Sequence, residues 1–136
     1  MASNDSLKVD RDHHPVVRGG AGQAIRIQRE VTELWSKTMQ RNNVELEIQR
    51  TFYVVADLCS EDKEVPQAIV RDMLGSVDST TSRNIAQLSI GATVGVHAPK
   101  LIESRVDPMY RRRKLIKLTA AGKRFIEAME AIHAKG

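Results

Sequence analysis

Hydrophobic residues recur at helical intervals along the chain and indicate two long helices in its first half. From residue 24 to about residue 40 they follow the spacing i, i+4, i+7, i+8 and i+12 of one helical face: Ile27, Val31, Leu34, Trp35 and Met39. Three polar residues, 41–43, interrupt this period. A second stripe then follows: Val44, Ile48, Phe52, Val55 and Cys59. Both stripes predict helices that pack against other elements.

A shorter third helix is predicted from Pro66 to Leu74. Proline suits a first helical turn, where its missing N–H costs nothing, and Gly75 supplies the left-handed stop. The expected inner face consists of four apolar residues: Ile69, Val70, Met73 and Leu74. A fourth helix should begin close behind this glycine turn, so residues 66–90 have the plan of a helix-turn-helix.

The fourth helix has one apolar face and one polar face. Asp78 or Ser79 is its expected N-cap, and the helix should bury Ile85, Leu88 and part of Thr81. The opposite face is predicted to be polar: Thr80, Arg83, Asn84 and Gln87.

A β-hairpin and a last helix are predicted after a loop rich in glycine. Residues 101–106 and 113–118 read as strands around a turn at 107–111, where Pro108 presets the bend. Thr119 can cap a final helix over residues 120–134, with an apolar stripe of Phe125, Ala128, Met129 and Ile132. The fold class is therefore mainly α with a small β-hairpin, a winged helix-turn-helix with the wing at residues 101–118.

Length and composition describe one domain. The chain has 136 residues, 41% of them hydrophobic and 28% charged, as expected of a soluble globular protein. Residues 1–23 are polar and rich in glycine and are predicted to be a flexible tail before a single domain at residues 24–136. We find neither a membrane-length apolar run nor a signal-peptide core, so a cytoplasmic location is expected.

The single cysteine narrows the chemistry further. Cys59 alone excludes an internal disulfide and a cysteine-built zinc site, and no metal or cofactor is expected. A buried structural thiol is the favoured interpretation, and a redox-sensing thiol is the alternative. The nearby carboxylates of Glu61 and Asp62 disfavour the alternative because they raise a thiol pKa.

The charge is divided unevenly between the two halves of the chain. Residues 29–64 hold five basic and eight acidic side chains, whereas residues 65–136 hold twelve basic and six acidic ones. Between residues 105 and 117 six basic residues accompany a single acidic one. A strongly basic hairpin beside a polar helix is typical of a protein that binds a polyanion.

Double-stranded DNA is the partner that this chemistry favours. Arginine pairs with guanine and Asn or Gln with adenine in the major groove, while hydroxyls anchor phosphates. The candidate DNA-binding residues are Ser79, Thr80, Thr81, Ser82, Arg83, Asn84 and Gln87 on the helix and Arg105, Arg111, Arg112, Arg113 and Lys114 on the hairpin. The alternative is a winged helix that only binds other proteins. We find no motif of a hydrolase, metalloenzyme or nucleotide-binding enzyme, so catalysis is not expected.

The wing and its exit carry a family resemblance. Residues 101–122, ending in Leu118-Thr119-Ala-Ala-Gly122, resemble the MarR family of winged-helix transcriptional regulators, and the Leu-Thr-x-x-Gly ending is the most specific part. Residues 82–89 are similar to the recognition helix of a subgroup with a long link before the wing, often encoded by phages.

This resemblance implies a homodimer that reads a pseudo-palindromic operator through recognition helices and wings. Dimerisation is then expected through helices 24–40 and 120–135, with these contacts: Ile27, Val31, Leu34, Trp35, Phe125, Met129 and Ile132. A small aromatic ligand is a further implied partner, for which Trp35, Phe52 and Tyr53 could line a pocket, and the favoured alternative places these three residues in the dimer core. Two departures from the family pattern stand out. Tyr110 replaces the acid that braces the wing arginine, here Arg112, and Asp107 could substitute as the brace. Arg71 occupies a usually small position, so either its side chain lies outward or the two helices cross at a wider distance.

Overall fold

The computed structural model describes residues 19–90 and 98–135. Within these ranges the chain forms five α-helices, a short 3₁₀ turn and a three-stranded sheet. The elements in chain order are α2 (Gly19–Met39), α3 (Leu46–Leu58), η1 (Ser60–Asp62), β1 (Val65–Pro66), α4 (Gln67–Leu74), α5 (Asp78–Ser89), β2 (Ile102–Val106), β3 (Lys114–Leu118) and α6 (Ala120–Lys135). The predicted fold class, mainly α with a winged helix-turn-helix, is confirmed.

The predicted start of the first helix was wrong. Helix α2 begins at Gly19, five residues before the expected boundary at residue 24, so the glycine-rich segment 19–22 is helical. The rest of the predicted tail, residues 1–18, and residues 91–97 of the predicted loop lie outside the described residues.

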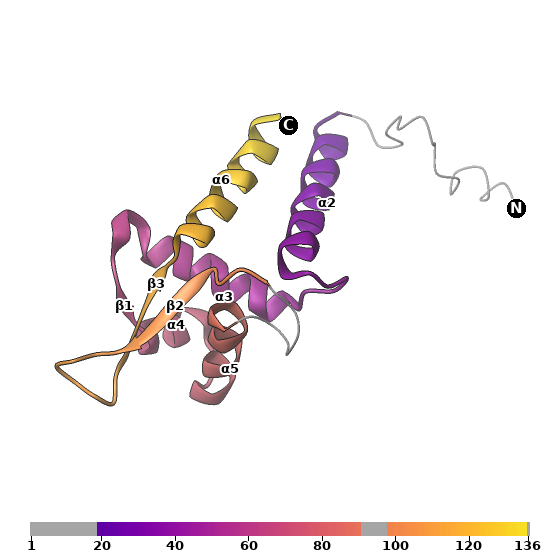
Figure 1. Ribbon diagram of the computed structural model, residues 1–136. Helices are drawn as coiled ribbons and strands as arrows, with labels where there is room; N and C mark the ends of the chain where they lie inside the picture. The colour runs from indigo at the N-terminus through magenta and orange to yellow at the C-terminus, as the bar shows by residue number, and fades with distance from the viewer. Residues whose placement is uncertain (1–18, 91–97, 136) are drawn as a thin grey trace, which may run out of the picture.

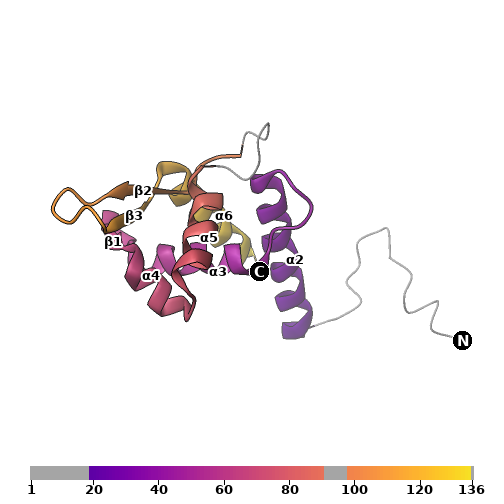
Figure 2. The same cartoon turned by 90° about the horizontal axis from the view of Figure 1, so that it is seen from below.

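The helices divide into a lobe and a projecting pair. Helices α3, α4 and α5 pack with the sheet into one lobe, while α2 and α6 lie side by side and extend away from it (Figure 1). The β2–β3 hairpin projects from one end of the molecule, and α2 lies at the opposite end (Figure 2). The basic end of the hairpin and helix α2 are therefore well separated.

The sheet contains a third strand, β1, that the sequence analysis does not predict. Its order is β1-β3-β2, all antiparallel, with Val65 opposite Ile116 on one side of β3 and Ser104 opposite Ile116 on the other. Strand β1 has only two residues, too few for the alternation by which strands are recognised. By pairing with β3, it ties the base of the hairpin to the residues that lead into α4.

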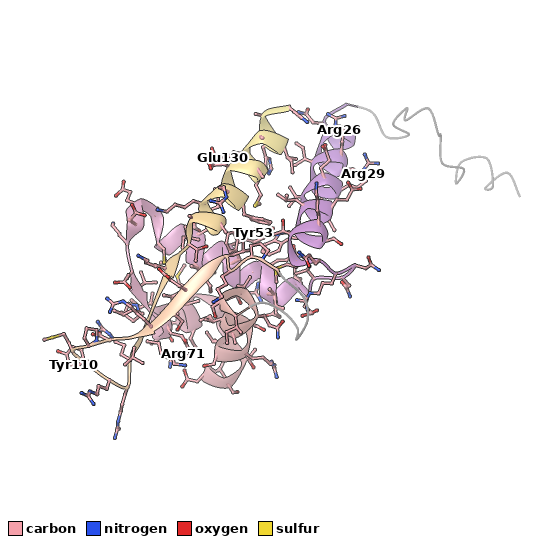
Figure 3. All side chains as sticks on the ribbon, viewed as in Figure 1. Arg26, Arg29, Tyr53, Arg71, Tyr110 and Glu130 are labelled. Carbon is pink, nitrogen blue, oxygen red and sulfur yellow. The ribbon has the colours of Figure 1, made fainter. Side chains whose placement is uncertain are left out.

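The core joins the two long helices to the lobe. Trp35 is fully buried, and its ring packs edge-on against Phe52 and tilted against Phe125, with centroids 5.4 and 4.5 Å away. Its Nε1–H donates a hydrogen bond of 2.8 Å to the hydroxyl of Tyr53, which Figure 3 places where α2 and α6 meet the lobe. Three predicted dimer contacts, Val31, Trp35 and Phe125, are thus buried within the chain's own core and are corrected here. Binding of a small aromatic ligand stays a prediction.

The exit from the wing has a steric reason for its glycine. The Thr119 hydroxyl accepts the Gly122 N–H at 3.0 Å, which confirms Thr119 as the cap of α6. A Cβ on Gly122 would overlap the carbonyl oxygen of Leu101 and lie 3.2 Å from Cδ2 of Leu118. Helix α6 can therefore start this close to β2 only because residue 122 has no side chain.

Several local predictions for α4 were correct and others were not. Gly75 adopts the expected left-handed conformation (φ 65°), and its N–H caps the helix. Val70 and Leu74 face inward, but Ile69 and Met73 are exposed, because only one side of this short helix meets the core. Pro66 precedes the helix as its N-cap instead of lying in the first turn.

Cys59 is a structural thiol. It is buried, and its S–H donates to the carbonyl of Ile116 at 3.3 Å. Burial raises the pKa of the thiol to about 11, and Glu64 contributes in the same direction. The favoured interpretation of a buried cysteine is confirmed.

Candidate nucleic-acid interface

Helix α5 presents a narrower polar face than the sequence predicts. Thr81 is fully buried and Asn84 is only 7% exposed, so both face the core beside Ile85 and Leu88. The spacing 81, 84, 85 and 88 is itself a helical stripe and could have shown that Asn84 points inward. The assignment of Thr81 and Asn84 to the DNA-binding face is therefore corrected.

The remaining residues of that face differ in their freedom. Ser79 and Arg83 are exposed, one helical turn apart, and Thr80 and Gln87 are half-buried. Ser82 is also half-buried, and its hydroxyl accepts a hydrogen bond of 2.8 Å from Nε2 of Gln67 on α4. Arg83 is thus the cation that α5 offers to an external partner.

An ion pair fixes the start of α5 against α4. The Arg71 guanidinium reaches Asp78 Oδ1 at 2.8 Å and Asp72 Oδ1 at 2.9 Å, and 32% of its side chain is exposed. Figure 3 shows Arg71 on the lobe between the helices and the hairpin. The outward orientation predicted for Arg71 is confirmed.

The prediction that Asp78 or Ser79 is the N-cap of α5 was wrong. The N-cap residue is Val77, whose side chain makes no capping hydrogen bond, and the Asp78 carboxylate pairs with Arg71.

The turn of the hairpin is closed by one buried carboxylate. Asp107, 4% exposed, accepts the Met109 N–H and the Arg113 Nε–H, each at 2.8 Å. These hydrogen bonds, first that from Met109, hold the pKa of Asp107 below its usual value. Asp107 therefore braces the wing, as the sequence suggested, but its arginine partner is Arg113 and not Arg112.

Backbone hydrogen bonds place two arginines at the end of the hairpin. The N–H of Arg113 donates to the carbonyl of Tyr110 at 2.8 Å, which makes Arg111 and Arg112 the central residues of a β-turn. The Arg113 guanidinium also lies 5.3 Å from the centroid of the Tyr110 ring. Tyr110 is labelled at the far end of the hairpin in Figure 3.

Ion pairing separates the basic residues of the hairpin into two groups. Near the base, Arg105 makes two hydrogen bonds of 2.7 Å to Glu64, and Lys117 lies 3.4 Å from Glu103. These contacts, together with Asp107, offset much of the charge of Arg105, Lys117 and Arg113. Within the part of the chain that the structure describes, the exposed Arg111, Arg112 and Lys114 have no ion-pair partner. The uncompensated charge therefore lies at the end of the hairpin.

A groove of about 470 Å³ separates α5 from the hairpin. Its lining comes from both elements and is mixed: it includes the polar or basic residues Ser82, Ser89, Ser104, Arg105 and Lys114, the acidic Glu103, and apolar residues such as Ile85, Ile90 and Val106. Hydroxyls and cations on facing walls suit the phosphodiester chain of a nucleic acid. Over residues 19–90 and 98–135, no cluster of metal-ligating side chains occurs, and no helix is long and apolar enough to span a membrane.

The fold is a winged helix in which two terminal helices, α2 and α6, accompany a helix-turn-helix and a wing, and solved structures share it. No protein-family model and no curated protein matches the sequence. Among solved structures, the S. aureus MepR–DNA complex has a TM-score of 0.58 at 23% identity and covers 80% of each chain. A MepR mutant bound to an oligodeoxyribonucleotide has a TM-score of 0.60 at 20% identity, with coverage of 82% of this chain and 71% of the other. The PcaV transcriptional regulator from Streptomyces coelicolor gives 0.50 at 22% identity, with coverage of 87% and 77%.

Proposed function

We propose that this protein is a sequence-specific, double-stranded DNA-binding transcriptional regulator that acts as a homodimer in the cytoplasm. The observation that carries the proposal is the group formed by Arg111, Arg112 and Lys114, three exposed cations without ionic partners among the described residues, at the end of a braced hairpin. Cations held close together repel one another, so their placement is favourable only when a polyanion approaches. The shared fold of the MepR–DNA complex supports the same conclusion.

Helix α5 reads the bases in this proposal. Arg83 is exposed on its outer face and Gln87 follows one turn later, so these two side chains are the candidates for contacts to guanine and adenine in the major groove. Ser79 and Thr80 lie at the start of the helix, where hydroxyls and backbone N–H groups suit phosphates. Arg71 orients this helix by holding Asp78.

The wing contacts the backbone and the minor groove beside it. Arg112, at the centre of the turn, enters a narrow minor groove, while Arg111 and Lys114 face the flanking phosphates. Arg113 and Arg105 act mainly as positioning residues, because their guanidinium groups are held by Asp107 and Glu64.

Two copies associate through α2 and α6. Four residues of the predicted interface are only partly buried by the chain itself: Ile27, Leu34, Met129 and Ile132. Ile25, 55% exposed, adds to the apolar surface of α2. Two-fold symmetry is the default for such an association, and it would present two copies of α5 to a pseudo-palindromic operator.

Selection of bound duplexes from random DNA, followed by binding of the selected duplex at several salt concentrations, tests the proposal. We expect one enriched pseudo-palindrome and a steep fall of affinity with salt. Sedimentation should give twice the chain mass of 15.2 kDa, and Ile132→Glu should lower it toward one chain. A protein-interaction module would instead enrich no sequence and show binding too weak to titrate.

A further inference from the structure

The end of the hairpin is apolar as well as basic. Met109 is 80% exposed, Tyr110 is 64% exposed and Val106 is 55% exposed. Of the large hydrophobic side chains on the described part of the chain, Met109 is the most exposed. The proposed DNA-binding roles use only the arginines and the lysine, so these apolar side chains have no function so far.

The backbone at Met109 is held by one hydrogen bond. Its N–H donates to the Asp107 carboxylate at 2.8 Å, and the same carboxylate accepts the Arg113 Nε–H at 2.8 Å, so Met109 lies in the braced turn with its side chain 80% exposed. Tyr110 differs, because its ring has the Arg113 guanidinium 5.3 Å from its centroid. The hairpin thus presents the exposed Met109 side chain next to the Tyr110 ring, which the Arg113 guanidinium contacts.

The charges around this apolar end specify what it can bind. Arg111 and Arg112 follow it directly in the chain, and both are exposed without ionic partners among the described residues. A minor groove offers a complementary arrangement, since phosphates line its two edges, the C–H surfaces of the sugars form its walls, and apolar base faces are exposed where a base step opens. Apolar side chains, methionine included, enter such grooves between base steps, unstack them and bend the duplex.

We propose that Met109 is a wedge that enters the DNA minor groove between two base steps and bends the duplex, while Tyr110 packs on the sugars of one groove wall. This inference rests on the proposed function and adds to it a contact that depends on shape and apolar surface. An anionic lipid surface would also accept apolar and basic side chains together. DNA is favoured because the polar face of α5 and the 470 Å³ groove lie beside the hairpin, and a flat surface would leave both unused.

Removing the wedge should affect binding independently of salt. Burial of a methionine side chain corresponds to about a tenfold change in affinity, so Met109→Ala should weaken binding by about that factor. Because the variant keeps every charge, the slope of log affinity against log salt should stay at the wild-type value. Arg112→Ala should reduce that slope, which separates the two contributions.

The experiment uses the full chain and a selected duplex that carries 2-aminopurine at one position at a time and a fluorophore pair at its ends. Wild type should raise the 2-aminopurine emission at a step beneath the wing and shorten the end-to-end distance. Met109→Ala should lose both signals, and Met109→Leu should restore them. Met73→Ala, which removes a methionine of 58% exposure from α4, is the matched control and should behave as wild type.

The possible outcomes separate this inference from the proposed function. If wild type binds and Met109→Ala shows the same affinity, emission and bend, the wedge is refuted and the DNA-binding function stands. If wild type binds no duplex, the proposed function fails and the wedge fails with it. Vesicles containing anionic lipid are the second arm. Wild-type binding to them that Met109→Ala abolishes, with DNA binding unchanged by that variant, would assign the apolar end to a membrane and overturn the inference.

Discussion

Replacement of Gly122 by alanine should destabilise the fold, although alanine is the better helix former. A Cβ at residue 122 would lie closer to the Leu101 carbonyl oxygen than Cβ atoms essentially ever do, and 3.1 Å from the carbonyl carbon. Both obstacles are backbone, so they cannot rotate away as a side chain would. The Leu101 carbonyl also accepts the Thr119 N–H at 3.1 Å, so a shift would strain the junction of β2 with α6.

The magnitude follows from two opposing effects. Overpacking costs about 1–3 kcal/mol, and a backbone obstacle places this site near the upper limit. Alanine regains about 1 kcal/mol of helix propensity over glycine. The net expectation for Gly122→Ala is a decrease of about 2 kcal/mol in the free energy of unfolding.

Urea denaturation followed by far-ultraviolet circular dichroism measures this change, with Gly20→Ala as the control. Gly20 is also helical, but a Cβ there would meet nothing within 4 Å, so this variant should be neutral or stabilised by up to about 1 kcal/mol. If Gly122→Ala proved as stable as wild type, the close approach of α6 to β2 would be wrong.

Three further predictions concern single side chains. Arg83→Ala should reduce the binding free energy for the selected duplex by about 1–3 kcal/mol and weaken the preference at one base pair, whereas Asn84→Ala should leave base preference intact. Equal effects of the two variants in binding titrations would contradict the assignment of an exposed Arg83 and a buried Asn84. The folded-state pKa of Asp107 is lowered, so its ionised carboxylate stabilises the fold above the ordinary pKa of 3.8, and this stabilisation is lost as the pH falls from 3.8 through the folded-state pKa. Asp107→Asn should therefore weaken the dependence of Tm on pH in the acid range. An unchanged dependence would argue against the brace. Cys59, with a pKa of about 11, should resist alkylation at pH 8 until urea unfolds the chain, and rapid labelling of the native protein would contradict its burial.

The sequence was sufficient for the order of elements and for the basic hairpin, because both rest on local patterns. Helical period, Gly75 and the Thr119 cap each act within a few residues, and they located α3, α4, α5 and α6 closely. Strand β1 escaped detection since its two residues become a strand only by pairing with β3, some fifty residues away.

The candidate site was predicted less completely, for a related reason. The sequence shows which residues are basic, but it does not show which of these residues form ion pairs with acidic side chains. Arg105 and Glu64 are far apart in sequence and meet only in the folded chain, and the choice of Arg113 over Arg112 by Asp107 depends on the geometry of the turn. Similarly, the apolar stripe of α2 and α6 was assigned to a partner, whereas Trp35 and Phe125 fill the chain's own core.

The most direct test of DNA binding by the wing is the salt dependence of affinity for single alanine variants on the selected duplex. Arg111→Ala, Arg112→Ala and Lys114→Ala should each reduce the log–log slope by about 0.9 for every phosphate that the variant no longer neutralises. Arg29→Ala is the control, because Figure 3 places Arg29 on α2, far from the hairpin, and its slope should equal that of wild type. Wild-type affinity and slope in all three wing variants would show that the wing does not touch DNA.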